Sequence, residues 1–212
     1  MNPNRRLLAT ALLLGALAPG RAALAQQRAP YTEINPPMQA DSAGKIEVVE
    51  FFWYGCIHCY NLEPVLEGWI KRLPQDVQFR RVPAVFSNRL AYDAAIYYSF
   101  EALGLLDKLH KPFFDAIHKD RLKTEDTAAL SEWLQKNGVD VPKFTQTMKS
   151  FGVQSRVRRA TQLTIASKID GTPAMAVEGR YTVSAEQGGS REGILKNVDQ
   201  LIEMARKGGK KP

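Results

Sequence analysis

The sequence predicts an α/β protein whose sheet domain is interrupted by a block of helices. Residues 46–82 show first an apolar run, then helical spacing, then alternation, which is the pattern of a strand, a helix and a second strand in one parallel crossover unit. Residues 88–150 are helical in character throughout. Two short strand patterns and a last helix follow, so the chain is expected to return to the sheet after the helical block.

The first strong strand is expected within residues 45–53. Its apolar side chains form a nearly continuous run, as is typical of a central strand that is buried on both faces. Residues 26–38 precede it, contain three prolines, and predict an extended arm with a short edge strand at 31–34. Tyr54 and Gly55 end the central strand, and helical spacing then begins at Cys56.

Four helices are expected in the helical block. Asn88 is expected to cap the first, and residues 105–119 form the second. Thr124 is expected to cap the third, and Pro142 suits the first turn of a short fourth helix. Residues 151–169, which follow the block, again predict a helix, so a long stretch of chain separates the two parts of the sheet.

The last third of the chain predicts a long helix, a hairpin and a closing helix. Residues 151–169 have one apolar face and predict a single helix. Residues 174–177 and 180–183 predict two strands joined by a turn that contains a glycine. Residues 194–206 predict the closing helix.

These patterns divide the mature chain into two parts. A sheet domain is expected to comprise residues 31–87 and 150–207, and residues 88–149 form a helical subdomain inserted between them. A chain of this length can bury a sizeable core without disulfides. We expect a monomer.

The N-terminus predicts an export signal over residues 1–25. Arg5 and Arg6 precede an apolar run at 7–18, and the small residues that follow predict cleavage after Ala25. The run is about a dozen residues long, whereas a membrane-spanning helix needs roughly 20. The ordinary secretory route is favoured, because the paired arginines match the twin-arginine pattern only loosely.

The charge balance argues against nucleic acid as a partner. The net charge is +7, and the expected export signal carries three of the arginines and no acidic residue. The mature chain is therefore only mildly basic. The dense basic run at 206–211 lies at the end of the chain, where a solvated tail is the expected structure.

The chain contains two cysteines, Cys56 and Cys59, and they lie three positions apart. Export would deliver them to an oxidising compartment. A disulfide between such near neighbours closes a very small loop and constrains the unfolded chain little. The pair therefore indicates chemistry more than structural support, although an inert surface disulfide is the alternative.

The position of the pair at a helix start indicates how it reacts. Unpaired backbone N–H groups and the helix dipole stabilise a thiolate at Cys56 and lower its pKa, and His58 adds a donor beside it. Each unit of pKa below about 7 favours the reduced form by about 1.4 kcal/mol, or roughly 30 mV. The pair should therefore give its disulfide away, with Cys59 as the resolving thiol.

Metal and haem sites are the competing interpretations of the pair. A zinc site needs about four ligands, and the sequence offers no second cysteine pair. His110 and His118 are eight residues apart and do not obviously converge. Covalent haem attachment requires histidine directly after the second cysteine, where this chain has Tyr60. We expect no metal and no resident cofactor.

Two further residues are candidates for the site. Glu50 lies within the apolar strand, where burial should raise the pKa of its carboxyl, and it could accept the proton of Cys59 through water. A polar edge of the strand is the alternative. Pro173 precedes the hairpin, and a cis bond there would expose the backbone of Thr172 to an extended peptide. For a proline taken at random, a trans turn is the commoner structure.

Three runs of the sequence resemble the DsbA family of bacterial periplasmic disulfide oxidants. They are Glu-Phe-Phe at 50–52, Cys-Ile-His-Cys-Tyr at 56–60 and Gly-Thr-Pro-Ala-Met at 171–175. The order of elements agrees as well, and the similarity covers nearly all of the mature chain. The resemblance implies a thioredoxin fold with an inserted all-helical subdomain.

The resemblance also implies roles for the matching residues. Cys56 is similar to the exposed nucleophile, Cys59 to its buried partner, His58 to the residue that tunes the potential, and Glu50 to the buried carboxylate. Pro173 matches the cis-proline that faces the disulfide.

The resemblance also implies which residues beside the cysteine pair contact the substrate. Thr172 is similar to the residue that shapes backbone contacts with the substrate, and Ile57 is a further candidate for substrate contact. Ile57 stands where well-studied oxidants have proline, and Gly55 stands where they usually have an aromatic residue. Both departures bear on redox potential and substrate choice.

The family implies partners and a location as well. Its substrates are reduced, unfolded exported proteins in the periplasm, and its members are reoxidised by DsbB, a quinone-linked protein of the inner membrane. Two alternatives remain: a disulfide isomerase or reductase on the same fold, and a peptide-binding chaperone module with a passive disulfide. Isomerases of this compartment usually carry a dimerisation domain, for which the arm before the first strong strand is too short.

Overall fold

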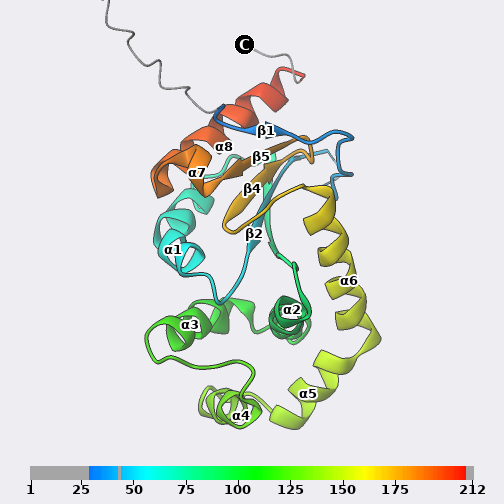
Figure 1. Cartoon of the computed structure of the whole chain (residues 1–212), viewed down its shortest axis with the longest axis vertical. Helices are drawn as coiled ribbons and strands as arrows, with labels where there is room; N and C mark the ends of the chain where they lie inside the picture. The colour runs from blue at the N-terminus through cyan, green and yellow to red at the C-terminus, as the bar shows by residue number, and fades with distance from the viewer. Residues whose placement is uncertain (1–28, 43, 209–212) are drawn as a thin grey trace, which may run out of the picture.

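The computed structural model describes residues 29–42 and 44–208, and it has the expected α/β architecture (Figure 1). The predicted export signal and its cleavage after Ala25 lie outside the described residues. Within the described ranges, no helix combines the length and the apolar character needed to cross a membrane.

A five-stranded sheet in the order β1-β5-β4-β2-β3 forms the centre of the molecule. Strand β2 pairs in parallel with β3 and antiparallel with β4, so it is covered on both edges and both faces. This position explains the nearly continuous apolar run of β2. The strands are β1 (Thr32–Glu33), β2 (Ile46–Phe52), β3 (Val77–Pro83), β4 (Ala174–Val177) and β5 (Tyr181–Ser184).

Helices α1 (Ile57–Ile70) and α8 (Arg191–Arg206) share one apolar core with the sheet. Leu62 of α1 and Leu201 of α8 are fully buried there with Val48 of β2. Since side chains alternate along a strand, Glu50 points to the same face of the sheet as Val48. Glu50 therefore lies under α1, which begins at the cysteine pair.

The remaining long helices form the other end of the molecule, and α6 returns the chain along the side of the sheet (Figure 1). A second core continues from Phe51 and Phe52 of β2 into the helical block, where Phe100 and Phe113 are fully buried. These helices are α2 (Asn88–Ala102), α3 (Leu106–His118), α4 (Thr127–Lys136), α5 (Val141–Lys149) and α6 (Phe151–Ala166).

Two predicted helix caps are wrong by one or two residues. Ser87 caps α2 in place of Asn88, and Asp126 caps α4 in place of Thr124. Asp126 accepts hydrogen bonds from two backbone amides of α4, whereas the buried Thr124 donates its hydroxyl to Asp93 at 2.6 Å. Each of these helix starts has several neighbouring residues that could serve as the N-cap, and tertiary packing determines which one does.

The hairpin is confirmed, and a helical turn after it was missed. Glu178 and Gly179 both have positive φ angles, of 54° and 60°, as a two-residue turn between right-twisted strands requires. Helix α7 (Ala185–Gly188) follows β5 and begins with a capping box formed by Ser184 and Gln187. Four residues are too few for a periodic pattern to be visible in the sequence.

The turn makes a prediction about stability. A Cβ atom at Gly179 would overlap the backbone carbonyl of Met38, and the positive φ angle adds strain. Gly179→Ala should therefore lower the free energy of unfolding by about 1–3 kcal/mol from strain, and by more because of the overlap with Met38. Gly68→Ala is the matched control, because an added Cβ on the exposed face of α1 meets nothing within 4 Å. That control should stabilise by about 0.5–1 kcal/mol. Urea unfolding measures both, and equal midpoints would contradict the prediction.

Candidate active site

The cysteine pair lies where β2 hands the chain to α1. Cys56 is the N-cap of α1, with extended backbone angles, and its Sγ accepts the backbone N–H of Cys59 at 3.4 Å. The residue before Cys56 is a glycine because the indole ring of Trp53 lies against the backbone there, and a Cβ at Gly55 would overlap that ring. Trp53 is held in turn by a 2.7 Å hydrogen bond from its Nε1 to Asp93 of α2.

The surroundings of Cys56 lower the pKa of its thiol to about 5. The largest cause is a hydrogen bond from the thiol of Cys59, which partial burial opposes; the side chain of Thr172 and the backbone amides of Cys59 and His58 add further stabilisation. Only donors can stabilise an anion, and several converge on this sulfur. Cys56 is therefore a thiolate at neutral pH.

Cys59 behaves in the opposite way. It is fully buried, and burial raises the pKa of its thiol well above the ordinary value, with the charges of Cys56 and Glu50 acting in the same direction. It therefore keeps its proton and donates it as a hydrogen bond to Cys56. The two sulfurs are made unequal by one turn of helix. Cys56 at the helix start is 9% exposed, so the nucleophile is less exposed than expected, and Cys59 is completely buried.

Thr172 and Pro173 lie beside the reactive sulfur. The Thr172–Pro173 peptide bond is cis, and the thiol of Cys56, when it holds its proton, donates to the carbonyl oxygen of Thr172 at 3.2 Å. Pro173 and His58 line an open hollow of about 730 Å³ that extends to α7 and the start of α8. Ile57 is 47% exposed next to Cys56. These residues are brought together around the sulfur, and the contribution of His58 to the pKa of Cys56 comes from its backbone amide.

Glu50 is completely buried in β2. Burial raises the pKa of its carboxyl to about 8, although the positive charge of Arg81 acts against that rise. The parallel register sets Glu50 directly beside Arg81 of β3, and Arg81 Nε donates to Glu50 Oε2 at 3.1 Å. The other carboxyl oxygen, Oε1, has no hydrogen-bond partner. Glu50 is therefore largely protonated at neutral pH.

Sequence reasoning missed the charged partners of Glu50. Arg81 Nη2 donates to both carboxyl oxygens of Glu63, at 3.2 and 3.1 Å, and His110 Nε2 lies 3.5 Å from Glu63 Oε1. A signal for Glu63 was present, because its spacing from Cys59 and Leu66 sets it on the buried face of α1. No comparable signal exists for Arg81, whose contacts depend on the register of two strands.

The two histidines of α3 converge, against expectation. His110 Nδ1 lies 2.9 Å from the hydroxyl of Tyr54, and His118 Nε2 lies 2.8 Å from the backbone carbonyl of the same residue. They meet on the turn before Cys56. In the described ranges, no group of three or more side chains is arranged to hold a metal.

A cysteine pair at the start of the first long helix, facing a cis-proline loop across the end of the sheet, defines a thiol-disulfide oxidoreductase of the thioredoxin fold. A family model for DSBA-like thioredoxin domains matches residues 80–192. The chain belongs to the DsbA family of thiol:disulfide interchange proteins.

Full-length relatives and solved structures agree with this assignment. The chain is 46% identical to the thiol:disulfide interchange protein DsbA of Bordetella parapertussis over 95% of this chain and 97% of that protein. It is 37% identical to the DsbA of Pseudomonas aeruginosa strain PAO1, over 98% of this chain and all of that protein. A crystal structure of Pseudomonas aeruginosa DsbA superposes with a TM-score of 0.80 at 37% identity, covering 86% and 95% of the two chains. For the oxidoreductase DsbA from Xylella fastidiosa the TM-score is 0.77 at 32% identity, covering 84% and 95%.

The donors around Cys56 predict a titration. The thiolate absorbance of the reduced protein should appear with a midpoint near pH 5. Thr172→Val removes one donor and should raise that pKa by about one unit, because a unit corresponds to about 1.4 kcal/mol, the net worth of one hydrogen bond to a charged group. Thr161→Val is the control, since its hydroxyl donates to Val157 within α6. A midpoint near the free-thiol value would contradict the assignment.

Proposed function

We propose that this enzyme works as an oxidant, which donates the Cys56–Cys59 disulfide to reduced, unfolded exported proteins. The observation that supports this direction is the pKa of about 5 at Cys56. A stabilised thiolate is a good leaving group and a stable product, so both the rate and the equilibrium favour transfer of the disulfide to substrate.

The exchange balances in two steps. A substrate thiolate attacks Sγ of Cys56, the bond between the two enzyme sulfurs breaks, and Cys59 leaves with the electron pair and takes a proton. A second substrate thiolate then attacks the substrate sulfur of the mixed disulfide and releases Cys56 as a thiolate. The substrate loses two electrons and gains a disulfide, and the enzyme is left reduced.

The surface around the sulfur supports binding of an extended segment. Thr172 and Pro173 border the sulfur on one side, and Ile57 and His58 are exposed on the other. An extended substrate would pair its backbone with Thr172 beside the cis-proline. His58 would tune the potential, and Ile57 would contact the substrate where other members of the family carry proline.

Glu50 would supply the proton that Cys59 needs. Cys59 is shut off from water, so its proton has to come from inside the protein. The carboxyl of Glu50 holds a proton at neutral pH, and its buried oxygen Oε1 has no hydrogen-bond partner, so one buried water molecule would complete the link to Cys59.

The cycle would be completed in the periplasm. The export signal would be removed after Ala25, and the mature monomer would comprise a sheet domain of residues 31–87 and 150–207 with the insertion at 88–149. A DsbB-like, quinone-linked protein of the inner membrane would then restore the disulfide. No resident cofactor is needed, because the electrons leave through the two sulfurs themselves.

The test compares two forms of ribonuclease. The oxidised enzyme should reactivate fully reduced ribonuclease and be much less active on the scrambled form, which needs an isomerase. Cys56→Ser should lose the activity. Cys59→Ser has no disulfide to donate, but its Cys56 thiolate should attack a disulfide of scrambled ribonuclease and accumulate as a mixed disulfide, because the resolving thiol is missing. Preference for scrambled ribonuclease would favour an isomerase. Full activity of Cys56→Ser would favour a chaperone with a passive disulfide.

The lowered pKa also predicts how stability depends on pH. Cys56 binds fewer protons in the folded reduced protein than in the unfolded chain, so its contribution is complete above the unfolded pKa of about 8.5 and is lost as pH falls through 5. As pH rises from 5 toward 8.5, the free energy of unfolding of the reduced protein should increase relative to that of the oxidised protein, and the gain should be about 2 kcal/mol at pH 7. Urea unfolding of both forms from pH 4 to 8 measures the difference. Cys56→Ser, which cannot form the disulfide, should lack the gain in stability that the reduced wild type shows as pH rises through this window. An oxidised wild type more stable than the reduced wild type at pH 7 would contradict the proposed direction.

A further inference from the structure

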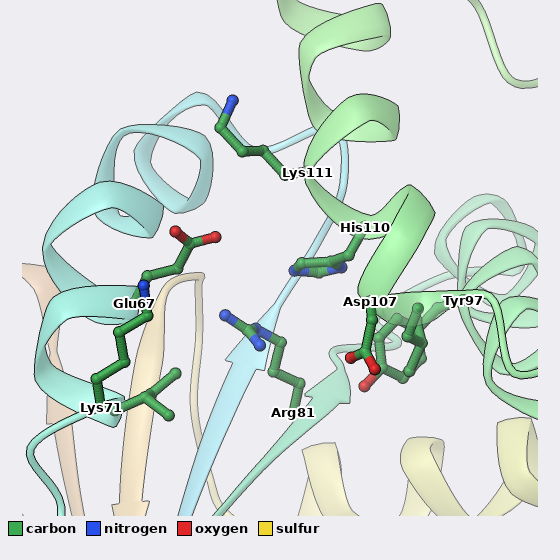
Figure 2. Close-up of a pocket in the computed structure, with 9 residues that line it drawn as sticks. Glu67, Lys71, Arg81, Tyr97, Asp107, His110 and Lys111 are labelled. Atoms are coloured by element: carbon green, nitrogen blue, oxygen red, sulfur yellow. The ribbon is translucent and has the colours of Figure 1, made fainter. Parts of the chain in front are cut away.

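A hollow of about 410 Å³ opens between α1 and α3, on the far side of the buried charges from the cysteine pair. Figure 2 shows Arg81 and His110 pointing into this space, with Glu67 on α1 across from them and Lys111 at the outer part of α3. Most of the residues that line it are polar or charged, so water has hydrogen-bond partners there.

His110 is the most unusual residue of this hollow. Its ring is 9% exposed and packs between Phe52, Tyr97 and Phe114, yet its Nε2 has no hydrogen-bond partner. A buried polar atom left unpaired is costly and calls for an explanation. The nearest acceptor is Glu63 Oε1 at 3.5 Å, which is within reach of a small movement or of one water molecule.

The guanidinium of Arg81 joins this histidine to Glu50. Its Nε and Nη2 lie on one edge of the same planar group, and they bind Glu50 and Glu63 respectively. Two carboxyls that share one guanidinium edge lie side by side. A series of polar side chains therefore leads from the hollow through His110 and Glu63 to Glu50, with the two carboxyls bridged by the guanidinium of Arg81.

We propose that this hollow is where protons enter, and that His110 passes them through Glu63 to Glu50. The inference rests on the proposed function. When Cys59 leaves as a thiolate it takes the proton of Glu50. His110 then takes a proton from water in the hollow and passes it to the ionised carboxylate of Glu63, which hands it on to the carboxylate of Glu50 and is itself ionised again. Protons run outward along the same path when the pair is reoxidised. His110 does not touch the reacting sulfurs and acts only through the two carboxyls.

The charges that face His110 favour inward transfer. Glu63 and Glu67 of α1 attract a proton, and Arg81 of β3 repels it, while Tyr54 and Tyr97 stay neutral because burial raises the pKa of both phenols. On α3 itself, Asp107 and Lys111 carry opposite charges. Burial lowers the pKa of His110, and it raises that of Glu50 to about 8. A proton therefore moves downhill overall from His110 to Glu50. It passes through Glu63, where burial is outweighed by the contacts with His110 and Arg81, so that the pKa of this carboxyl is lowered and Glu63 holds the proton only in passing.

The experiment measures single-turnover reduction of the disulfide by a dithiol peptide, followed by tryptophan fluorescence. His110→Gln keeps a polar group but cannot carry a proton, so it should slow release of Cys59 by at least about tenfold, as loss of an acid-base group does. Glu50→Gln should slow it at least as much. His110→Ala should be slow as well, and imidazole added to the solution should enter the hollow and restore the rate.

His118→Ala is the matched control, since it also removes a contact between α3 and Tyr54 but does not line the hollow. Imidazole should leave its rate unchanged. The proposal is overturned if His110→Gln reacts within twofold of the wild type, if imidazole fails to restore His110→Ala, or if imidazole accelerates His118→Ala equally. If the wild type fails to oxidise reduced ribonuclease, the proposed function is wrong. If the wild type oxidises it but the His110 variants react as fast as the wild type, the proposed function stands and only this inference is wrong.

Discussion

The stabilisation of one negative sulfur at the start of α1 is the interaction on which the rest of the site depends. Cys56 caps the helix, so the donors that would otherwise be unpaired at the helix start serve the thiolate. Each pKa unit of that stabilisation is worth about 1.4 kcal/mol toward the reduced enzyme. The geometry in turn requires Gly55, because the indole of Trp53 closes over the backbone at that point.

The charges beneath the pair follow from the same need. Arg81 carries one positive charge and faces two carboxyls, so the buried cluster is neutral when Glu63 is ionised and Glu50 holds a proton. Ionising Glu50 would leave an uncompensated negative charge in the interior, next to a thiolate, and this explains why the pKa of Glu50 rises despite the arginine. A buried carboxyl that keeps its proton suits a partner thiol that has to gain and lose one.

Local patterns predicted most of the fold and the centre of the site. The apolar run of β2, the cysteines at a helix start and the glycine in the hairpin turn each carry their signal within a few residues. Arg81 and His110 carry none, because their contacts with Glu50 and Glu63 come from the β2/β3 register and from the packing of α3 against α1. The caps of α2 and α4 were misplaced for a related reason, since tertiary packing chooses among neighbouring residues that cap equally well.

The helical block contributes to the chemistry as well as covering the sheet. All three aromatic residues around the pair are anchored in it: Trp53 bonds to Asp93 of α2, Tyr60 to Asp115 of α3, and Tyr54 to both histidines of α3. The end of β2 is therefore fixed from the block, while the helix that starts at Cys56 is fixed by the sheet. Because a hydrogen bond weakens as its donor moves away or out of line, the reactivity of Cys56 depends on how these two parts of the chain pack together.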